Sequence, residues 1–342
     1  NIEDKTEDNA VLWNKFLNEF DLLPTGSFSV FVESLIFLLK KYVWCIPSNT
    51  ADVANVSLFE HMKLTATFVD CLFRFRDENA GDFFWDEQRK RLCLSKNSEP
   101  VLLVGGDISG IQKFIYDISS NKAALSLKGR SFYLQLLIDS IIQRILSRVD
   151  ATWGNVVYSS GGKFYMLLPN VDSVKKGLHE LGLEFENFLW KKHHGKLLFN
   201  WDFVSFAYDD AGNLHWNRKE RTLGDLWRGL SEKLVEKKNQ KFCTVLHSNF
   251  GEMFVPQNIN PEGKICAVTG IESNECVLLQ DVYVLPTVLE QVKLGKVLKD
   301  ADYILTHRYE PDNSVCRGSG RKFDIEIAGI CNYLFDQCEL AN

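Results

Sequence analysis

The sequence has 342 residues, of which 45% are apolar and 25% are charged, and its formal net charge is −6. This composition is typical of a globular protein with two or three domains and excludes a globally basic nucleic-acid binder. No run of about 18 apolar residues occurs, so no membrane contact is expected. The nine cysteines are dispersed, and the acidic start is no signal peptide. These features predict reduced thiols in a cytoplasmic protein.

The first part of the chain, residues 1–95, is predicted to be a helical region. Residues 11–46 carry two helical patterns, and residues 57–76 carry a third that begins after a serine cap. The stripe expected on this third helix holds Leu58, His61, Thr65, Phe68 and Leu72. We interpret His61 as a surface or core residue, because an HD-type hydrolase needs an adjacent His-Asp pair and the sequence has none.

Residues 96–210 are predicted to form one compact domain. The apolar run Val101–Val104 leads into Gly105, Gly106 and Asp107, which indicates a buried strand that ends at a tight turn. The elements expected after it are a helix over 131–146, strands over 156–158 and 164–168 joined by the hairpin 159–163, a helix over 173–194 and a strand over 196–207. This order is that of a ferredoxin-like palm, an antiparallel sheet with two helices, so the predicted fold class is α+β.

Residues 211–342 are predicted to form a mixed domain. A charged helical pattern over 218–242 has a basic face of Arg228, Lys237, Lys238 and Lys241, which is either a solvated face or a contact for RNA or a partner subunit. Cys266 and Cys276 suggest a zinc-ribbon-like segment at first sight. A structural zinc is improbable there, because the position three after Cys266 is Thr269 and no second knuckle follows.

The strand end and the hairpin tip of the central domain are the candidate functional site. Two-metal nucleotidyl transfer needs carboxylates at both places, but the hairpin offers Lys163 and no acid. We therefore assign no catalytic residue and no metal ligand. Glycine N–H groups, serine hydroxyls and a lysine can still hold phosphates. The predicted nucleotide-binding residues are Asp107, Ser109, Gly110, Ser160, Gly161, Gly162 and Lys163.

A purely structural interpretation of the same residues stays open. In it, Asp107 caps a helix over 109–118 and the glycines close a hairpin, with no ligand involved.

Three stretches of the central domain carry a family resemblance. GDISGIQKFIYDI (106–118), KGRSFYLQLL (128–137) and YSSGGKFYMLLPN (158–170) resemble the first palm domain of the large subunit of type III-A CRISPR–Cas effector complexes. Residues 42–50 and 56–73 resemble the end of that subunit's HD domain. Residues 226–242 and 293–305 resemble its inter-palm domain. The likeness spans roughly residues 30–310 in collinear order.

The resemblance implies a component of an RNA-guided antiviral complex whose large subunit makes cyclic oligoadenylates from ATP and cuts single-stranded DNA. The family's Gly-Gly-Asp-Asp hairpin of the second palm and its His-Asp motif do not occur in this sequence. The resemblance therefore implies that the first palm binds ATP, while a second palm supplies the acids that bind Mg²⁺. Whether this chain is itself part of an enzyme stays open.

The implied partners are the subunits that bind guide RNA, a second-palm chain and, indirectly, the guide and target RNAs. The inter-palm zinc knuckles of the family are eroded here, at Thr269 and near Leu285 and Val288. A fragment, half of a split subunit and a degenerate scaffold are all compatible with the sequence. The alternative function is a non-catalytic scaffold of the same complex that binds no nucleotide.

Overall fold

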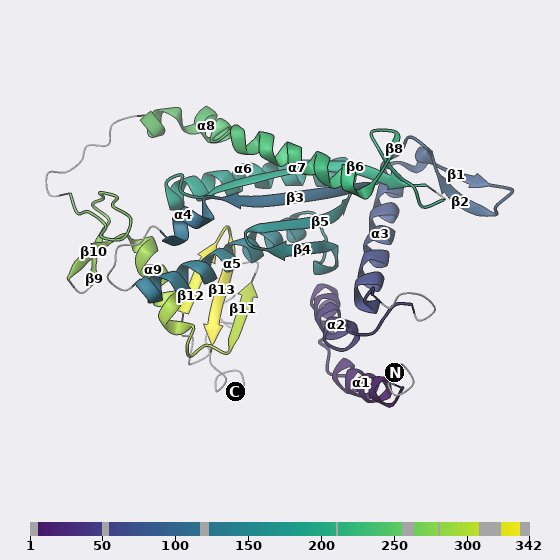
Figure 1. Cartoon of the computed structure of the whole chain (residues 1–342), viewed down its shortest axis with the longest axis horizontal. Coiled ribbons are helices and arrows are strands. Elements are labelled where there is room, and N and C mark those ends of the chain that lie inside the picture. The colour runs from purple at the N-terminus through teal and green to yellow at the C-terminus, as the bar shows by residue number, and fades with distance from the viewer. Residues whose placement is uncertain are drawn as a thin grey trace.

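The computed structural model describes residues 6–49, 55–116, 123–209, 211–254, 263–279, 281–307 and 323–335. Their central feature is a six-stranded antiparallel sheet with strand order β4-β5-β3-β6-β7-β8 (Figure 1). Helices pack on both faces of this sheet, so the predicted α+β class is confirmed. The strands are β3 (Val101–Ser109), β4 (Val156–Ser160), β5 (Lys163–Pro169), β6 (Leu198–Tyr208), β7 (Leu214–Trp216) and β8 (Lys219–Arg221).

The two faces of the sheet are covered by different helices, because successive side chains of β3 point to opposite sides. Leu102 and Val104 pack with the buried sides of α5 (Ala123–Arg148) and α6 (Asp172–His193). Val101 and Leu103 pack with α3 (Leu58–Glu78) and α7 (Leu223–Asn239). Each fully buried leucine in these cores contributes about 1.5–3 kcal/mol. This alternation along β3 determines which face of the sheet each of its residues lies on, including those of the candidate site.

Strand β3 does not end at Gly105 and Gly106, as the sequence predicted, but continues to Ser109. A Cβ atom on Gly106 would lie 2.3 Å from the Phe164 ring, and one on Gly105 would lie 3.1 Å from both Leu230 and Tyr165. The two glycines therefore let side chains pack closely against the middle of the strand. The prediction of a tight turn at these glycines was wrong, because the two residues serve close packing inside the strand.

The N-terminal region holds α1 (Thr6–Phe20), α2 (Phe28–Val43) and α3, which lie toward one end of the sheet in Figure 1. It is not helical throughout, because a hairpin of β1 (Phe83–Asp86) and β2 (Arg91–Leu94) follows α3 and the short 3₁₀ turn Ala80–Asp82. The expected stripe on α3 was also wrong, since His61, Thr65 and Leu72 are exposed. The buried positions are Phe59, Thr67, Cys71 and Phe75.

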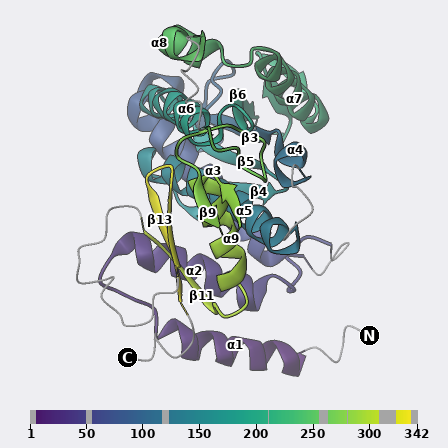
Figure 2. The same ribbon diagram turned by 90° about the vertical axis from the view of Figure 1, so that its left-hand side faces the viewer.

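The C-terminal region continues with α8 (Cys243–Phe254), the hairpin β9 (Val277–Leu279) and β10 (Val282–Val284), and α9 (Pro286–Val297). A three-stranded sheet in the order β11-β13-β12 follows, with β11 at Tyr303–His307, β12 at Phe323–Ile327 and β13 at Ile330–Phe335. Figure 2 shows α9 beside α5. Their close approach needs Gly129, whose Cβ would lie 1.8 Å from the Gln291 carbonyl oxygen.

The described cysteines, Cys45, Cys71, Cys93, Cys243, Cys266, Cys276 and Cys331, are free thiols. Cys316 and Cys338 lie outside the described residues, as do positions 117 and 118 of the predicted helix over 109–118. Within the described ranges, no helix is both long and apolar enough to cross a bilayer.

Candidate nucleotide-binding site

The β4–β5 hairpin closes with a two-residue turn at Gly161 and Gly162. Both have positive φ angles, +61° and +83°, a conformation that two-residue hairpin turns require and glycine adopts at little cost. The Ile108 N–H donates to the Gly162 carbonyl oxygen at 2.8 Å, which attaches the turn to the end of β3. The β3–β5 register places Lys163 directly opposite Asp107. The structure therefore brings the predicted strand end and hairpin tip together.

The polar groups of the hairpin tip differ in exposure. The Lys163, Ser160 and Gly161 positions are exposed, and Gly162 is partly exposed. A Cβ atom at Gly161 would meet nothing within 4 Å, whereas one at Gly162 would lie 2.0 Å from Ile111. The tip is thus open to solvent on the Gly161 side and closed by α4 (Ile111–Tyr116) on the Gly162 side.

Asp107 is 5% exposed and pairs with a lysine of α7, a helix that follows the central region in sequence. The Nζ atom of Lys238, in the last turn of α7, lies 2.6 Å from Oδ2 of Asp107. The Ser109 hydroxyl donates to the same Oδ2 at 3.4 Å, and the Asn200 amide donates to Ser109 Oγ at 2.9 Å. The carboxylate charge is therefore matched by an ammonium group, which disfavours Asp107 as a ligand for a divalent cation.

This pairing changes two expectations. Asp107 turns to Lys238 and Ser109, so its carboxylate is not used as a helix cap in the described residues. Lys238 does not belong to a solvated basic face, and Arg228 of the same predicted face lies 3.4 Å from the Asp225 carboxylate. Of the four basic residues predicted for that face, Arg228, Lys237 and Lys241 are exposed.

Gly110 begins the chain segment that follows the strand. Its φ angle is +94°, and a Cβ atom there would lie 2.1 Å from the Lys196 carbonyl oxygen, so only glycine fits. The Phe114 N–H donates to the Gly110 carbonyl oxygen at 2.9 Å, which starts α4. The backbone of Leu198, Lys196 and Phe114 therefore fixes the positions of Ser109 and Gly110 at the end of β3.

Aromatic side chains extend the same sheet face beyond Lys163. The Tyr165 ring lies 4.6 Å from the Trp227 ring and 6.2 Å from the Tyr158 ring, centroid to centroid. Burial, and then the nearby Asp107 charge, raise the pKa of Tyr165, while Lys238 opposes them. The Tyr165 phenol thus stays protonated at neutral pH. Tyr158 is 51% exposed and lies across from Tyr165 on β4.

The predicted zinc-ribbon-like segment has an apolar interior. Cys266 and Cys276 are buried with Leu285 and Val288, the residues at the eroded knuckle positions. Burial raises the pKa of the Cys266 thiol, but hydrogen bonds from Thr269, Leu285 and Val268 outweigh it and lower the pKa overall. Among the residues described, no three His, Cys, Asp or Glu side chains gather as a metal site would require.

Comparisons with known proteins agree on one family. Residues 100–256 match the family model described as Csm1 subunit domain B. The Cas10/Csm1 single-strand-specific deoxyribonuclease (subtype III-A) of Mycobacterium tuberculosis is 33% identical over 221 residues, which cover 62% of this chain and 27% of that protein. The corresponding protein of Methanocaldococcus jannaschii is 31% identical over 281 residues, 75% of this chain and 34% of that protein. The chain thus spans about a third of the length of the curated relatives it matches.

Solved structures show the same fold. The apo Csm1–Csm4 cassette has a TM-score of 0.65 at 20% identity, covering 97% of this chain and 36% of that chain. The Csm1–Csm4 cassette in complex with one ATP has a TM-score of 0.60 at 19% identity, covering 95% and 37%. At these identities the likeness concerns the fold alone.

Proposed function

This chain belongs to the Cas10/Csm1 family of subtype III-A, and we propose that it supplies the first palm of a composite ATP site in an RNA-guided antiviral complex. The order β3-α5-β4-β5-α6-β6 and the strand order β4-β5-β3-β6 are those of a ferredoxin-like palm, which supports this role. A second palm supplies the catalytic carboxylates and binds the Mg²⁺ ions used in cyclic oligoadenylate synthesis. Zinc has no role in the site.

The hairpin tip beside the strand end is the observation that carries this assignment. We propose that the Lys163 ammonium group and the exposed Gly161 backbone bind the triphosphate, with Ser160, Gly162, Ser109 and Gly110 around it. The open space at Gly161 and the exposure of Lys163 support direct contact with a ligand. Asp107 pairs with Lys238, so its carboxylate places no unbalanced negative charge beside the triphosphate.

The domain division and the partners are part of the same proposal. We propose a helical region over 1–95, the palm over 96–210 and an inter-palm domain over 211–342. The chain would associate with a subunit that binds guide RNA, with a second palm and, indirectly, with the guide and target RNAs in the cytoplasm. Solved structures of the fold include Csm1–Csm4 complexes, one of them described as a complex with ATP, which supports both the partner class and the ligand class.

Calorimetric titration of the purified chain with ATP tests the site. Binding without product formation is the expected result, and Lys163→Ala should weaken it at least tenfold, because a charge-assisted contact contributes about 1.5–3 kcal/mol. Lys219→Ala, an exposed lysine on β8, serves as the control. In a complex with an active second palm, an unchanged rate of cyclic oligoadenylate synthesis after replacement of residues 160–163 would contradict the assignment.

The second candidate is a scaffold of the same complex that binds no nucleotide. The ion pair of Asp107 with Lys238 and the packing of Gly105 and Gly106 against core side chains favour it, because these groups then serve the fold alone. A flat calorimetric trace with ATP, both for the chain and for its complex with a second palm, would support the scaffold.

A further inference from the structure

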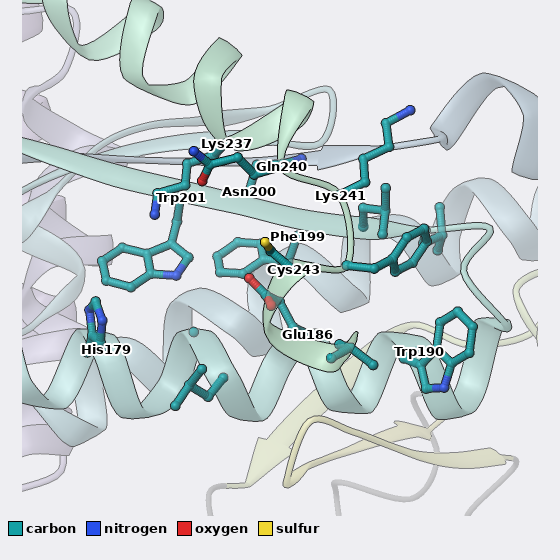
Figure 3. Close-up of a pocket in the computed structure, with 16 residues that line it drawn as sticks. His179, Glu186, Trp190, Phe199, Asn200, Trp201, Lys237, Gln240, Lys241 and Cys243 are labelled. Atoms are coloured by element: carbon teal, nitrogen blue, oxygen red, sulfur yellow. The ribbon is translucent and has the colours of Figure 1, made fainter. Parts of the chain in front are cut away.

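A separate pocket lies on the edge of the central sheet, between α6 and the connection from α7 to α8 (Figure 3). The cavity has a volume of about 110 Å³, and residues 197–201 form one side of it. Strand β6 pairs with β3 along Leu198–Phe206 but with β7 only at Ala207 and Tyr208. Within the described residues, the stretch of β6 that lines the pocket is therefore an open strand edge.

The backbone of this edge offers hydrogen-bond donors and acceptors. The Phe203 carbonyl oxygen accepts from Lys233 Nζ at 2.8 Å, and the Phe203 N–H donates to Asp202 Oδ1 at 2.7 Å, so both groups point away from β3. In an antiparallel ladder this direction repeats at every second residue. The N–H and C=O groups of Phe199 and Trp201 consequently face the pocket. A donor and an acceptor side by side match the edge of a heteroaromatic base.

Aromatic rings stand at both ends of the pocket. Trp201 and His179 lie at one end with ring centroids 5.8 Å apart, and Trp190 lies with Phe242 at the other, 5.3 Å apart (Figure 3). The Trp201 indole lies directly on α6 because Gly182 has no side chain, and a Cβ there would be 2.1 Å from the indole nitrogen. Such flat surfaces bind nucleobases by stacking without a strong sequence preference.

The charges at the rim favour an anion. Lys237 and Lys241 line the pocket, and neither ammonium group pairs with another of the described residues. Glu186 is the one carboxylate among the lining residues. The Lys241 side chain extends outward from the rim in Figure 3, where a phosphate at the solvent side would lie. Two ammonium groups at the mouth of an aromatic pocket complement a base that carries a phosphate.

We propose that this pocket binds a nucleobase with its phosphate, either as a free nucleotide or as one unit of a single strand. The base lies on the β6 edge between the two aromatic pairs, and the phosphate meets Lys237 and Lys241. The open edge is too short for a peptide strand, because Lys233 and Asp202 already occupy it at Phe203. The pocket is distinct from the proposed ATP site, to which it is joined by Asn200, a lining residue that donates to Ser109.

Protection of a cysteine tests this inference without an activity assay. Cys243 is an exposed free thiol that lines the pocket, while the exposed Cys45 lies in the N-terminal region. The purified chain is alkylated with iodoacetamide in the presence of AMP, of a ten-residue oligoadenylate or of ribose 5-phosphate, and each site is followed by mass spectrometry. AMP, the oligonucleotide or both should slow alkylation of Cys243 about tenfold at saturation, because thiol reactivity follows exposure. Cys45 should be unaffected, and ribose 5-phosphate should give no protection.

Variants separate this pocket from the ATP site. Lys237→Glu with Lys241→Glu should abolish protection, whereas Lys293→Glu with Lys296→Glu, two exposed lysines on α9, should leave it intact. Lys163→Ala should also leave it intact. No protection by either AMP or the oligonucleotide would overturn the inference. So would protection that survives in the Lys237/Lys241 variant and is lost in Lys163→Ala, since the ligand would then occupy the strand-end site. Protection by an unrelated extended peptide, and not by nucleotides, would indicate strand addition instead.

Discussion

Lys238 Nζ lies 2.6 Å from Asp107 Oδ2, and the Asp107 side chain is only 7% exposed. The lysine comes from the last turn of α7 and the aspartate from the end of the central strand β3, so this ion pair joins the C-terminal end of the helix to the end of that strand. Leu226, Leu230 and Leu234 of the same helix are buried against the strand's apolar half. Apolar packing, this ion pair and the contacts of Lys233 with Asp202 and the Phe203 carbonyl oxygen together fix the position of α7.

Lys238→Met should destabilise the chain by about 1–3 kcal/mol, because it leaves a buried carboxylate without its cation. Denaturant unfolding of the single variants and of the double variant with Asp107→Asn measures the coupling between the two side chains. Lys241→Met, an exposed lysine, should change stability by less than about 0.5 kcal/mol. Additive effects of the two substitutions would show that the ion pair does not contribute.

Gly106→Ala should be one of the most harmful small substitutions in the chain. The added Cβ would lie 2.3 Å from the buried Phe164 ring, and overpacking of this kind costs about 1–3 kcal/mol. Gly81→Ala, where a Cβ atom would meet nothing within 4 Å, is the matched control. Thermal and denaturant unfolding of both variants measure the difference. If the two variants prove equally stable, the close packing at Gly106 is not needed.

The chain should lose stability as the pH falls, because His193, the last residue of α6, is buried. His193 Nε2 lies 2.8 Å from the Tyr133 hydroxyl, and burial, followed by the charges of Lys192, His194 and Arg130, lowers the pKa of His193 to about 3. Below its usual pKa of about 6.5 the unfolded chain binds a proton that the folded chain does not, so stability rises with pH between these values. The expected loss from pH 6.5 to pH 5 is about 1–2 kcal/mol.

The variant His193→Gln should remove most of this pH dependence, while His61→Gln, on the exposed side of α3, should retain it. Urea unfolding of the three proteins at several pH values between 5 and 7 gives the slopes. Parallel slopes for the wild type and His193→Gln would assign the pH dependence to other groups.

Metal chelation should leave the zinc-ribbon-like segment intact. Its buried interior has the thiols of Cys266 and Cys276 together with Leu285 and Val288, whereas a structural zinc needs four N or S ligands. Treatment with a strong zinc chelator should therefore shift the midpoint of thermal unfolding by less than about 1 °C, in contrast to domains that fold only with metal. Stoichiometric zinc in elemental analysis, together with a drop in the midpoint after chelation, would contradict this.

The hairpin tip of the candidate site was predictable because its determinants are local. Two adjacent glycines between short apolar strands specify the turn, and the strand–helix–hairpin order places Lys163 near Asp107. The partners of Asp107 were not predictable, since Lys238 and Asn200 come from distant elements. In sequence, Lys238 is one of several lysines on a polar helix pattern, and Asn200 lies between two aromatic residues of a mostly apolar strand. A carboxylate and a lysine in separate elements give no signal of their contact.

Two errors in the predicted fold have the same cause, which is packing between elements that are distant in sequence. Gly105 and Gly106 suggest a turn when considered alone, but the shapes of Phe164, Tyr165 and Leu230 require them inside a strand. On α3, periodicity favoured Thr65, whereas the fold buries Thr67, whose hydroxyl donates to the Gly154 carbonyl oxygen at 2.9 Å. The strands β1 and β2 have four residues each, too few to show an alternation in sequence.

The charged pair at Phe203 has a consequence for solubility. A free strand edge is a template on which the strand of another molecule can add, and continued addition leads to aggregates. On β6, Lys233 and Asp202 occupy the outward backbone groups of Phe203, so an incoming strand would have to displace two charged side chains to extend past Trp201. Lys233→Ala with Asp202→Ala would leave a longer, uncharged edge. The wild-type residues thus oppose the addition of a second strand at this edge.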